Sequence, residues 1–179
     1  MNVHGASGSG RDTASLALRA TLGPMLMAHG WNKLRGAGGI AGTTKWFDSL
    51  GLRPAGLHAR VAAGTELAAG AGLLAGLANP LPAAAAVGLM TVAARTDHRG
   101  KGFFVFKGGW EYTAVVGGAA VALAALGHGR WSLDGVLPVR TRNGTRGAVI
   151  AAGLGTVAAG AMLRVSYRPA VEEPDPGEV

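Results

Sequence analysis

Glu66 is the side chain best placed to do chemistry, because it is the one ionisable residue within a long apolar stretch, residues 61–94. An unpaired carboxylate inside a membrane is costly, so intramembrane acids face a bundle interior or a wet cavity and find a partner. Glu66 is therefore a candidate catalytic acid that exchanges a proton, or a ligand-binding acid. The alternative is a structural acid that pairs with a cation from another helix.

His29 and Lys33 are the candidate partners of Glu66. They are four residues apart, so they share one face of a helix. As a pair they can bind an anionic or quinone-like headgroup. Alternatively, Lys33 anchors the end of the helix and His29 caps it. No metal site is predicted, because the spacing of the histidines is not that of metal ligands.

The other polar candidates lie beside apolar segments. Glu111 is a candidate ligand-binding residue if it faces the same cavity as Glu66. Otherwise its charge suits the positive N-terminus of a helix. Trp131 and Asp134 belong to a structural turn, which the Asp134 carboxylate is expected to stabilise by accepting backbone hydrogen bonds.

Apolar segments that are long enough to cross a bilayer must position these residues. About twenty apolar residues span the hydrocarbon core of a membrane. Asn79-Pro80-Leu81-Pro82 breaks the central stretch into a hairpin, because proline ends helices. The predicted membrane helices are residues 14–31, 58–77, 81–94, 108–126 and 147–163.

The loops between these helices contain shorter apolar segments. Residues 44–50, with Trp46 and Phe47, are predicted to form a short interfacial helix. Residues 103–106 are too short to span and are expected to lie at the interface or to dip back against the bundle. Asp97 and His98 are interpreted as a solvated pair in a loop.

The helix predicted over residues 58–77 has two distinct faces. At 100° per residue, Gly70, Leu73 and Leu77 share the face of Glu66. A ladder of small residues lies on roughly the other side and is predicted to let a neighbouring helix approach closely. This ladder consists of Gly64, Ala68, Gly72 and Gly76. The helix is thus expected to separate its packing face from its carboxylate face.

Composition favours a membrane protein. Charged residues make up 15% of the 179 residues, and the mean hydropathy is +0.27, which fits a membrane protein better than a soluble basic one. The Lys and Arg residues behind the net charge of +7 are dispersed in short loops, so no nucleic-acid partner is expected. Cysteine is absent, which excludes disulfides and thiol chemistry in this chain.

The ends of the chain lack apolar character. Residues 1–13 are rich in Gly and Ser, without the apolar core of a cleavable signal peptide. They are expected to be disordered, as are residues 166–179, which become acidic and proline-rich. The chain is predicted to cross the plasma membrane several times, with the lipid bilayer as its first partner.

Charge in the loops predicts the orientation. The first two large loops and nearby Arg60 carry nine basic residues: Lys33, Arg35, Lys45, Arg53, Arg60, Arg95, Arg99, Lys101 and Lys107. Cytoplasmic loops carry the excess of Lys and Arg. These loops and the C-terminus are therefore expected in the cytoplasm.

Several short motifs follow one another in a recognisable order. They are Arg19 and Gly23, His29-Gly30-Trp31-Asn32-Lys33, Trp46-Phe47, Gly51-Leu52, Ala63-Gly64-Thr65-Glu66, the glycines Gly70, Gly72 and Gly76, Glu111-Tyr112, and Gly127-His128-Gly129-Arg130-Trp131-Ser132-Leu133-Asp134. In this order the chain resembles the DoxX family of small four-helix bacterial membrane proteins.

The resemblance implies an all-α integral membrane helix bundle. Its four-helix DoxX-like core would cover residues 14–134. The resemblance does not cover the rest of the chain. Its own sequence predicts a loop and a fifth transmembrane helix over residues 135–165 and an acidic tail over residues 166–179. The residues that fall on the family's polar motif positions are His29, Lys33, Glu66, Glu111 and Asp134.

The resemblance also implies a function. The family takes its name from a subunit of an archaeal terminal quinol oxidase and thiosulfate:quinone oxidoreductase system. Some actinobacterial members are linked with membrane oxidoreductase complexes and with resistance to oxidative or thiol stress. This implies quinone-linked redox chemistry with other membrane or soluble redox proteins. The resemblance assigns no catalytic role to a residue; our hypothesis is that Glu66 exchanges a proton and that His29 with Lys33 holds the quinone head or its anion.

The chain has no haem, flavin or iron–sulfur signature, so no intrinsic cofactor is expected and the electrons must come from a bound quinone or another subunit. Two other functions stay open. One is a non-enzymatic scaffold that recruits soluble redox enzymes through its basic loops. The other is a small-molecule or proton transporter that uses the same Glu66.

Overall fold

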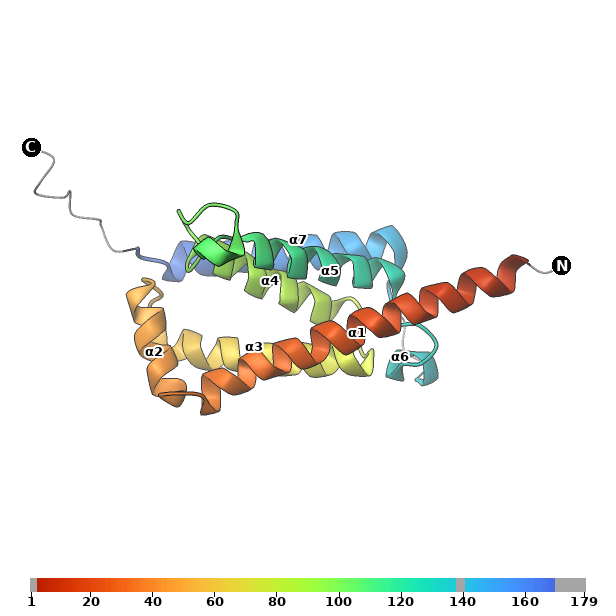
Figure 1. Ribbon diagram of the computed structural model, residues 1–179, viewed down its shortest axis with the longest axis horizontal. Helices are drawn as coiled ribbons and strands as arrows, with labels where there is room; N and C mark the ends of the chain where they lie inside the picture. The colour runs from red at the N-terminus through yellow and green to blue at the C-terminus, as the bar shows by residue number, and fades with distance from the viewer. Residues whose placement is uncertain (1–2, 138–140, 170–179) are drawn as a thin grey trace, which may run out of the picture.

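The computed structural model describes residues 3–137 and 141–169, and within them the regular structure is helical, with no strand (Figure 1). This confirms the all-α class. The elements are α1 (Val3–Arg35), α2 (Gly39–Ser49), α3 (Ala55–Ala75), α4 (Leu81–Arg95), the 3-10 turn η1 (Val105–Lys107), α5 (Glu111–Leu126), α6 (Leu133–Val136) and α7 (Gly144–Ser166).

The long helices form two groups that lie side by side (Figure 1). In the first group α1 packs along α3, and the short α2 crosses their end. In the second group α4 packs against both α5 and α7. A shared apolar core joins the two groups; it includes Leu26 of α1, Leu73 of α3, Val87 of α4, Leu123 of α5 and Ala151 of α7.

The central hairpin forms where the sequence predicts it. α3 ends at Ala75, and the next residue, Gly76, has a φ of 64° in the left-handed region. Glycine is favoured there because it has no Cβ. α4 then begins at Leu81, with Pro82 in its first turn, where the missing amide hydrogen of proline costs little. The predicted helix boundaries differ from the observed ones by only a few residues.

Close packing of α1 on α3 depends on glycines in both helices. A Cβ on Gly70 would lie 2.6 Å from the carbonyl oxygen of Gly23, and a Cβ on Gly30 would lie 2.8 Å from that of Ala63. These distances are too short for any side chain, so the two backbones touch. The contact brings the C-terminal half of α1 against the face of α3 that carries Glu66.

This contact corrects the predicted assignment of the faces of α3. In the predicted packing ladder, Gly64 and Ala68 are exposed, and a Cβ on Gly64 would meet nothing within 4 Å. Gly72 faces Pro82 at the start of α4. The packing face and the carboxylate face are therefore one face, because α1 approaches α3 on the side of Gly70.

Arg19 is buried inside the bundle, although it is charged and lies near the start of a predicted membrane helix. Its side chain is 5% exposed. The guanidinium donates hydrogen bonds of 2.6–3.1 Å to the carbonyl oxygens of Leu73, Leu74, His128 and Trp131. It thereby satisfies carbonyls that the end of α3 leaves without a helical partner.

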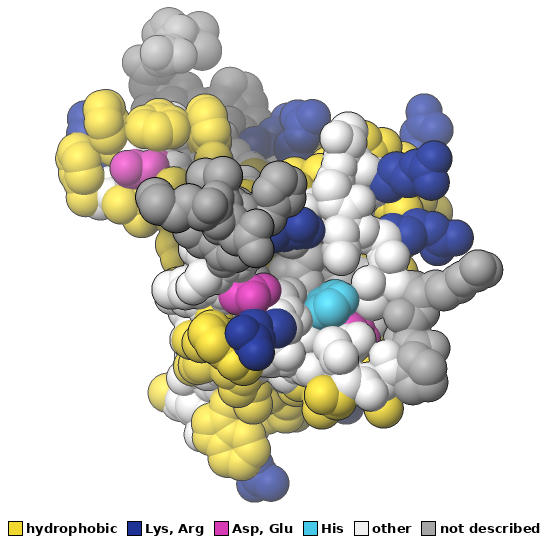
Figure 2. All heavy atoms as spheres, turned by 90° about the vertical axis from the view of Figure 1, so that its right-hand side faces the viewer, with side chains coloured by type: hydrophobic (Ala, Val, Ile, Leu, Met, Phe, Trp, Pro, Cys, Tyr) yellow, Lys and Arg dark blue, Asp and Glu magenta, His cyan; other side chains and the backbone are white. Residues whose placement is uncertain are grey.

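Asp134 stabilises the hairpin turn that follows α3, at the end of the bundle where Arg19 is buried. Its carboxylate accepts hydrogen bonds from the backbone amides of Ala78, at 2.8 Å, and Asn79, at 3.0 Å. The turn that it holds is thus the one between α3 and α4, and not its own. Figure 2 views the bundle from this end, where basic, acidic and histidine side chains lie among apolar ones.

The N-terminal segment differs from the prediction. α1 begins at Val3, so residues 3–13 are helical where disorder is expected from their composition. The added turns are held by Arg11, which donates to the carbonyl of Leu126 at 2.6 Å, and by Asp12, which accepts the amide of Arg130 at 3.0 Å. The partners, at the end of α5 and in the loop after it, lie more than one hundred residues away, so local composition does not reveal these contacts.

The C-terminal segment also begins with ordered structure. Ser166 ends α7, and Tyr167 forms an isolated antiparallel bridge with Leu52. Residues 166–169 are therefore attached to the segment between α2 and α3, where the sequence predicts disorder. The rest of the predicted acidic tail, residues 170–179, lies outside the described residues.

One described helix, α7, is both long and apolar enough to cross a membrane, with a mean hydropathy of 1.7 over its best window. α4 and α5 are apolar but shorter, at 15 and 16 residues. Large apolar side chains are exposed on the outer surfaces of several helices: Leu57, Val61 and Leu74 of α3, Val115 of α5, and Val149, Leu154, Val157 and Val165 of α7.

Candidate functional site

A cavity of about 710 Å³ lies between the two groups of helices. Ligand pockets in proteins measure roughly 300–1,000 Å³, so the volume suits a small organic molecule. Side chains from α1, α2, α3, α4, α5 and α7 line it, and most of them are apolar. Its polar side chains include Lys33, Glu66, His29 and Tyr112, which come from three helices.

Lys33 and Glu66 form an ion pair at the wall of this cavity. Lys33 Nζ lies 2.7 Å from Glu66 Oε1, and the two side chains are 13% and 7% exposed. The second carboxylate oxygen, Glu66 Oε2, is buried and has no hydrogen-bond partner among the described residues. Buried polar atoms are nearly always satisfied. Glu66 Oε2 is an exception to this rule, in a residue that lines the cavity.

His29 and Tyr112 lie together at the same cavity. The Tyr112 hydroxyl is 3.3 Å from His29 Nε2 and 3.2 Å from the sulfur of Met25. Met25, His29 and Lys33 follow one another at intervals of four residues, so one face of α1 presents all three. The structure thus brings together His29, Lys33 and Glu66, as the sequence analysis requires for a shared site, and adds a phenol from α5.

The aromatic segment of α2 closes one end of the cavity. Trp46, Phe47 and Leu50 all line it, with Trp46 43% exposed and Phe47 8% exposed. Lys33 Nζ lies 6.0 Å from the centroid of the Trp46 ring, a distance at which a cation still attracts an aromatic face. The predicted interfacial helix therefore also contributes to the site.

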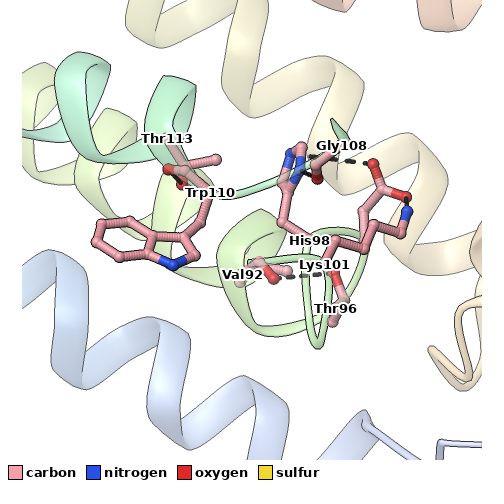
Figure 3. A network of polar contacts seen from close by, with 8 residues as sticks. Val92, Thr96, His98, Lys101, Gly108, Trp110 and Thr113 are labelled. Atoms are coloured by element: carbon pink, nitrogen blue, oxygen red, sulfur yellow. Dashed lines mark hydrogen bonds and ion pairs between the residues drawn. The ribbon is translucent and has the colours of Figure 1, made fainter. Parts of the chain in front are cut away.

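Asp97 and His98 lie at the cavity and not in a fully solvated loop. Their side chains are 29% and 18% exposed, and both line the cavity. His98 Nδ1 is 2.6 Å from the carbonyl oxygen of Gly108, and Lys101 Nζ is 3.5 Å from Asp97 (Figure 3). These contacts hold the first residues of the loop between α4 and α5 at the cavity. The contact of His98 with the Gly108 carbonyl cannot be predicted from the sequence pattern.

Glu111 lies outside the cavity. Its carboxylate accepts the backbone amide of Val105 at 3.0 Å, within the aromatic loop that precedes α5. The aromatic side chains of this loop are exposed, from 45% for Phe103 to 77% for Phe106. The structure therefore separates Glu111 from Glu66, whereas the next residue, Tyr112, reaches the cavity.

Trp131 and Asp134 lie at the opposite end of the bundle from α2. Trp131 is 51% exposed and acts through its backbone carbonyl, which accepts from Arg19 at 2.6 Å. Asp134 is buried and holds the hairpin turn. Among the described residues, no group of three His, Asp or Glu side chains is arranged to hold a metal ion.

Tyr112 and Trp46 are site residues that were not predicted from the sequence, although Trp46 was predicted to lie in a short interfacial helix. The signal for Tyr112 is its place one residue after Glu111, which turns it by about 100° around the helix. For Trp46, the signal is its position on an amphipathic segment that must bury one face. Neither signal identifies the partner helix.

Comparison with known proteins gives one result for the family. The model of the DoxX family matches residues 14–99. No curated protein and no solved structure matches the chain. The matched segment covers most of α1 and all of α2, α3 and α4, with His29, Lys33 and Glu66. The resemblance noted through Asp134 thus extends beyond the match, which ends before α5. Residues 14–99, just under half of the chain, are thus similar to the DoxX family.

Proposed function

We propose that this protein is an integral membrane bundle that crosses the plasma membrane several times, with a DoxX-like core and α7 as an additional membrane helix. The exposed apolar side chains of α3, α5 and α7 support this, because they suit a lipid environment. α4 and α5 are roughly 23 Å long at 1.5 Å per residue. A bilayer accommodates short helices of this kind by local thinning.

The positions of the loops support one orientation. The nine basic residues that predict a cytoplasmic side lie toward the α2 end of the bundle, which also holds the C-terminal end of α7 (Figure 1). Under the positive-inside rule the α2 end faces the cytoplasm. The end with Arg19 and Asp134 then faces the opposite side.

The function that the site supports best is binding of a quinone-like molecule in support of redox chemistry. The observation that carries this proposal is the buried Glu66 Oε2, which lacks a partner at the wall of a large apolar cavity. A quinone head presents two carbonyl acceptors on an apolar ring. The ammonium of Lys33, the hydroxyl of Tyr112 and the imidazole of His29 are donors suited to such oxygens.

A bound quinone would supply two-electron, two-proton redox chemistry. The residues of this chain would hold the ring and exclude water, while Glu66 exchanges a proton at Oε2. Lys33 would keep the carboxylate in place through Oε1. We expect the electrons to come from a partner redox protein, because the sequence shows no haem, flavin or iron–sulfur signature.

The cavity also bears on the two alternative functions. A scaffold needs surface loops and has no use for a large cavity beside a buried carboxylate, so the cavity favours a ligand-binding role. A transporter needs the same cavity, and it also needs a path from the cavity to both membrane surfaces. The experiments must therefore also be able to detect transport of a substrate that is not a quinone.

Native mass spectrometry of the protein, extracted gently with its lipids, tests the proposal first. A bound mass equal to that of the cell's quinone is expected. A copurifying soluble enzyme without any small ligand would favour the scaffold instead.

Fluorescence quenching then tests binding at this cavity. Quinones quench nearby tryptophans, so titration with a short-chain ubiquinone should quench Trp46 saturably. Trp46→Phe should remove this component, and the matched control Trp131→Phe, at the other end of the bundle, should retain it. Equal quenching in both variants would place the quinone elsewhere.

Quinone reduction in native membranes tests the role of Glu66. A deletion strain complemented with Glu66→Gln should insert the protein but lose the quinone-dependent turnover that the unmodified chain restores. Unchanged turnover would exclude Glu66 as the proton-exchanging group.

A further inference from the structure

The cavity reaches the surface of the bundle between α3 and α7. Three of its lining residues are about half exposed: Val61 of α3 at 54%, Leu81 of α4 at 56% and Leu154 of α7 at 49%. Ala158, one turn after Leu154, also lines the cavity and is exposed. Residues that are both cavity-lining and exposed mark its open edges, and the four at this edge are apolar. His29 of α1 and Trp46 of α2 also line the cavity and are exposed, so a second edge is more polar.

The packing of the helices explains the opening. α3 packs mainly against α1, α2 and α4, whereas α7 packs mainly against α4 and α5. α4 therefore forms the floor between them. Its lining residues there are small, namely Ala84, Ala85 and Gly88. A Cβ on Gly155 of α7 would lie 2.4 Å from the carbonyl oxygen of Ala84, so α7 rests directly on this floor.

At the α2 end of the bundle, backbone hydrogen bonds join the segment between α2 and α3 to the end of α7. The amide of Arg53 donates to the carbonyl of Ser166, and the amide of Arg168 donates to that of Gly51, both at 2.7 Å. Leu52 and Phe47 are buried against Met162, Leu163 and Tyr167 at the end of α7. This strap joins the α2–α3 segment to α7 at the end that faces water in the proposed orientation.

We infer that the cavity takes a lipid-soluble amphiphile with a single aliphatic chain, which enters from the bilayer through the opening between α3 and α7. The polar head lies against Lys33, Glu66 and Tyr112. The chain leaves the cavity between Val61 and Ala158 and continues into the surrounding lipid. This inference rests on the proposed function and deepens it, because it names the route and the physical class of the ligand.

The opening depends on a part of the chain outside the DoxX match. α7 supplies Leu154, Ala158 and Met162, and it begins well after residue 99, where the match ends. Residues on α7 therefore determine whether a chain-bearing ligand fits. A bulky side chain at Ala158 would obstruct the route of the chain but not the position of the head.

Two quinones that differ only in their chains test the inference. Decylubiquinone and the same dimethoxy-methyl-benzoquinone without a chain are titrated into the protein in nanodiscs, with quenching of Trp46 as the readout. Ala158→Phe should weaken binding of decylubiquinone about tenfold, the effect expected of overpacking. It should leave the chainless quinone within about twofold of its original affinity. The matched control Val157→Phe, on an exposed face of α7 outside the cavity, should change neither.

The outcomes separate the inference from the proposed function. If neither quinone quenches Trp46 in the unmodified protein, the proposed function is overturned, and the inference with it. If both quinones bind and Ala158→Phe changes neither affinity, the opening is not the route, although the proposed function stands. Equal weakening of both quinones would also overturn the inference, because the variant would then act on the head. Val61→Phe, on the opposite edge of the opening, should reproduce the selective loss.

Discussion

Lys33 and Glu66 lie 33 residues apart in the sequence, and their side chains meet at 2.7 Å inside the bundle. The contact requires the close approach of α1 to α3 that Gly23, Gly30 and Gly70 permit. It leaves the second oxygen of the buried carboxylate without a hydrogen-bond partner among the described residues, and Glu66 lines the cavity. A structural ion pair and a candidate functional group are thus combined in one arrangement.

Removal of Lys33 should destabilise the protein, because it leaves the Glu66 charge buried and unpaired. Lys33→Met is expected to cost about 3–5 kcal/mol. The double variant Lys33→Met with Glu66→Leu should regain most of the lost free energy of unfolding, because well-packed apolar side chains can substitute for a buried ion pair at little cost in stability. Thermal unfolding in detergent measures both, with the exposed Lys45→Met as control. Equal stability of the single and double variants would show that the pair is not buried as described.

The crossing of α1 and α3 predicts opposite effects for two glycines of one helix. Gly70→Ala should destabilise the protein, because its Cβ would lie 2.6 Å from the Gly23 carbonyl oxygen. Gly64→Ala should be neutral or stabilising by about 0.5–1 kcal/mol, because its Cβ meets nothing and alanine favours helices. Unfolding curves of the two variants provide a matched comparison. If Gly64→Ala destabilised the protein more than Gly70→Ala, the packing face would be the ladder of Gly64, Ala68 and Gly72 after all.

Arg19 should be a major contributor to stability. Arg19→Met removes hydrogen bonds to four carbonyl oxygens on two segments of the chain, and each bond to a charged group is worth about 1.5–3 kcal/mol. We expect a loss of at least about 3 kcal/mol. Arg11→Met, which removes one exposed hydrogen bond, should cost about 1 kcal/mol or less. A similar cost for both variants would contradict the role of Arg19 at the core.

Asp134 should protect the hairpin turn. Asp134→Ala leaves the amides of Ala78 and Asn79 without their acceptor, at a cost of about 1–3 kcal/mol. Hydrogen exchange at these two amides should accelerate selectively. The exposed Asp48→Ala serves as the control and should leave them unchanged. Unaltered protection in Asp134→Ala would mean that the turn is stable without this carboxylate.

The two tyrosines provide a matched test of the ligand site. Tyr112→Phe removes the hydroxyl that lies between His29 and Met25 at the cavity. It should weaken binding of a short-chain quinone about tenfold, the value of one hydrogen bond. Tyr167→Phe, outside the cavity at the end of α7, should have little effect. Quenching of Trp46 reports both affinities, and equal affinities would remove Tyr112 from the site.

Sequence patterns predicted the helices of this protein well. The hairpin of α3 and α4, the helix α5 and the helix α7 begin and end within a few residues of their predicted boundaries. Long apolar segments and proline breaks act locally, so they are visible in the chain itself. Lys33 was also one of the two partners predicted for Glu66, because few cations lie near the ends of apolar helices.

The sequence by itself thus determined the all-helical class, the DoxX relationship and the small set of polar residues that an apolar bundle must satisfy. Only the tertiary structure decided which face of α3 meets α1, that Glu111 turns away while Tyr112 turns inward, and that α7 completes the cavity. The reason is physical. A helix sequence defines its faces, but the neighbour that covers each face depends on contacts between segments distant in the chain. Burial of Arg19 against His128 and Trp131, and of Leu52 against Tyr167, follows from those contacts alone.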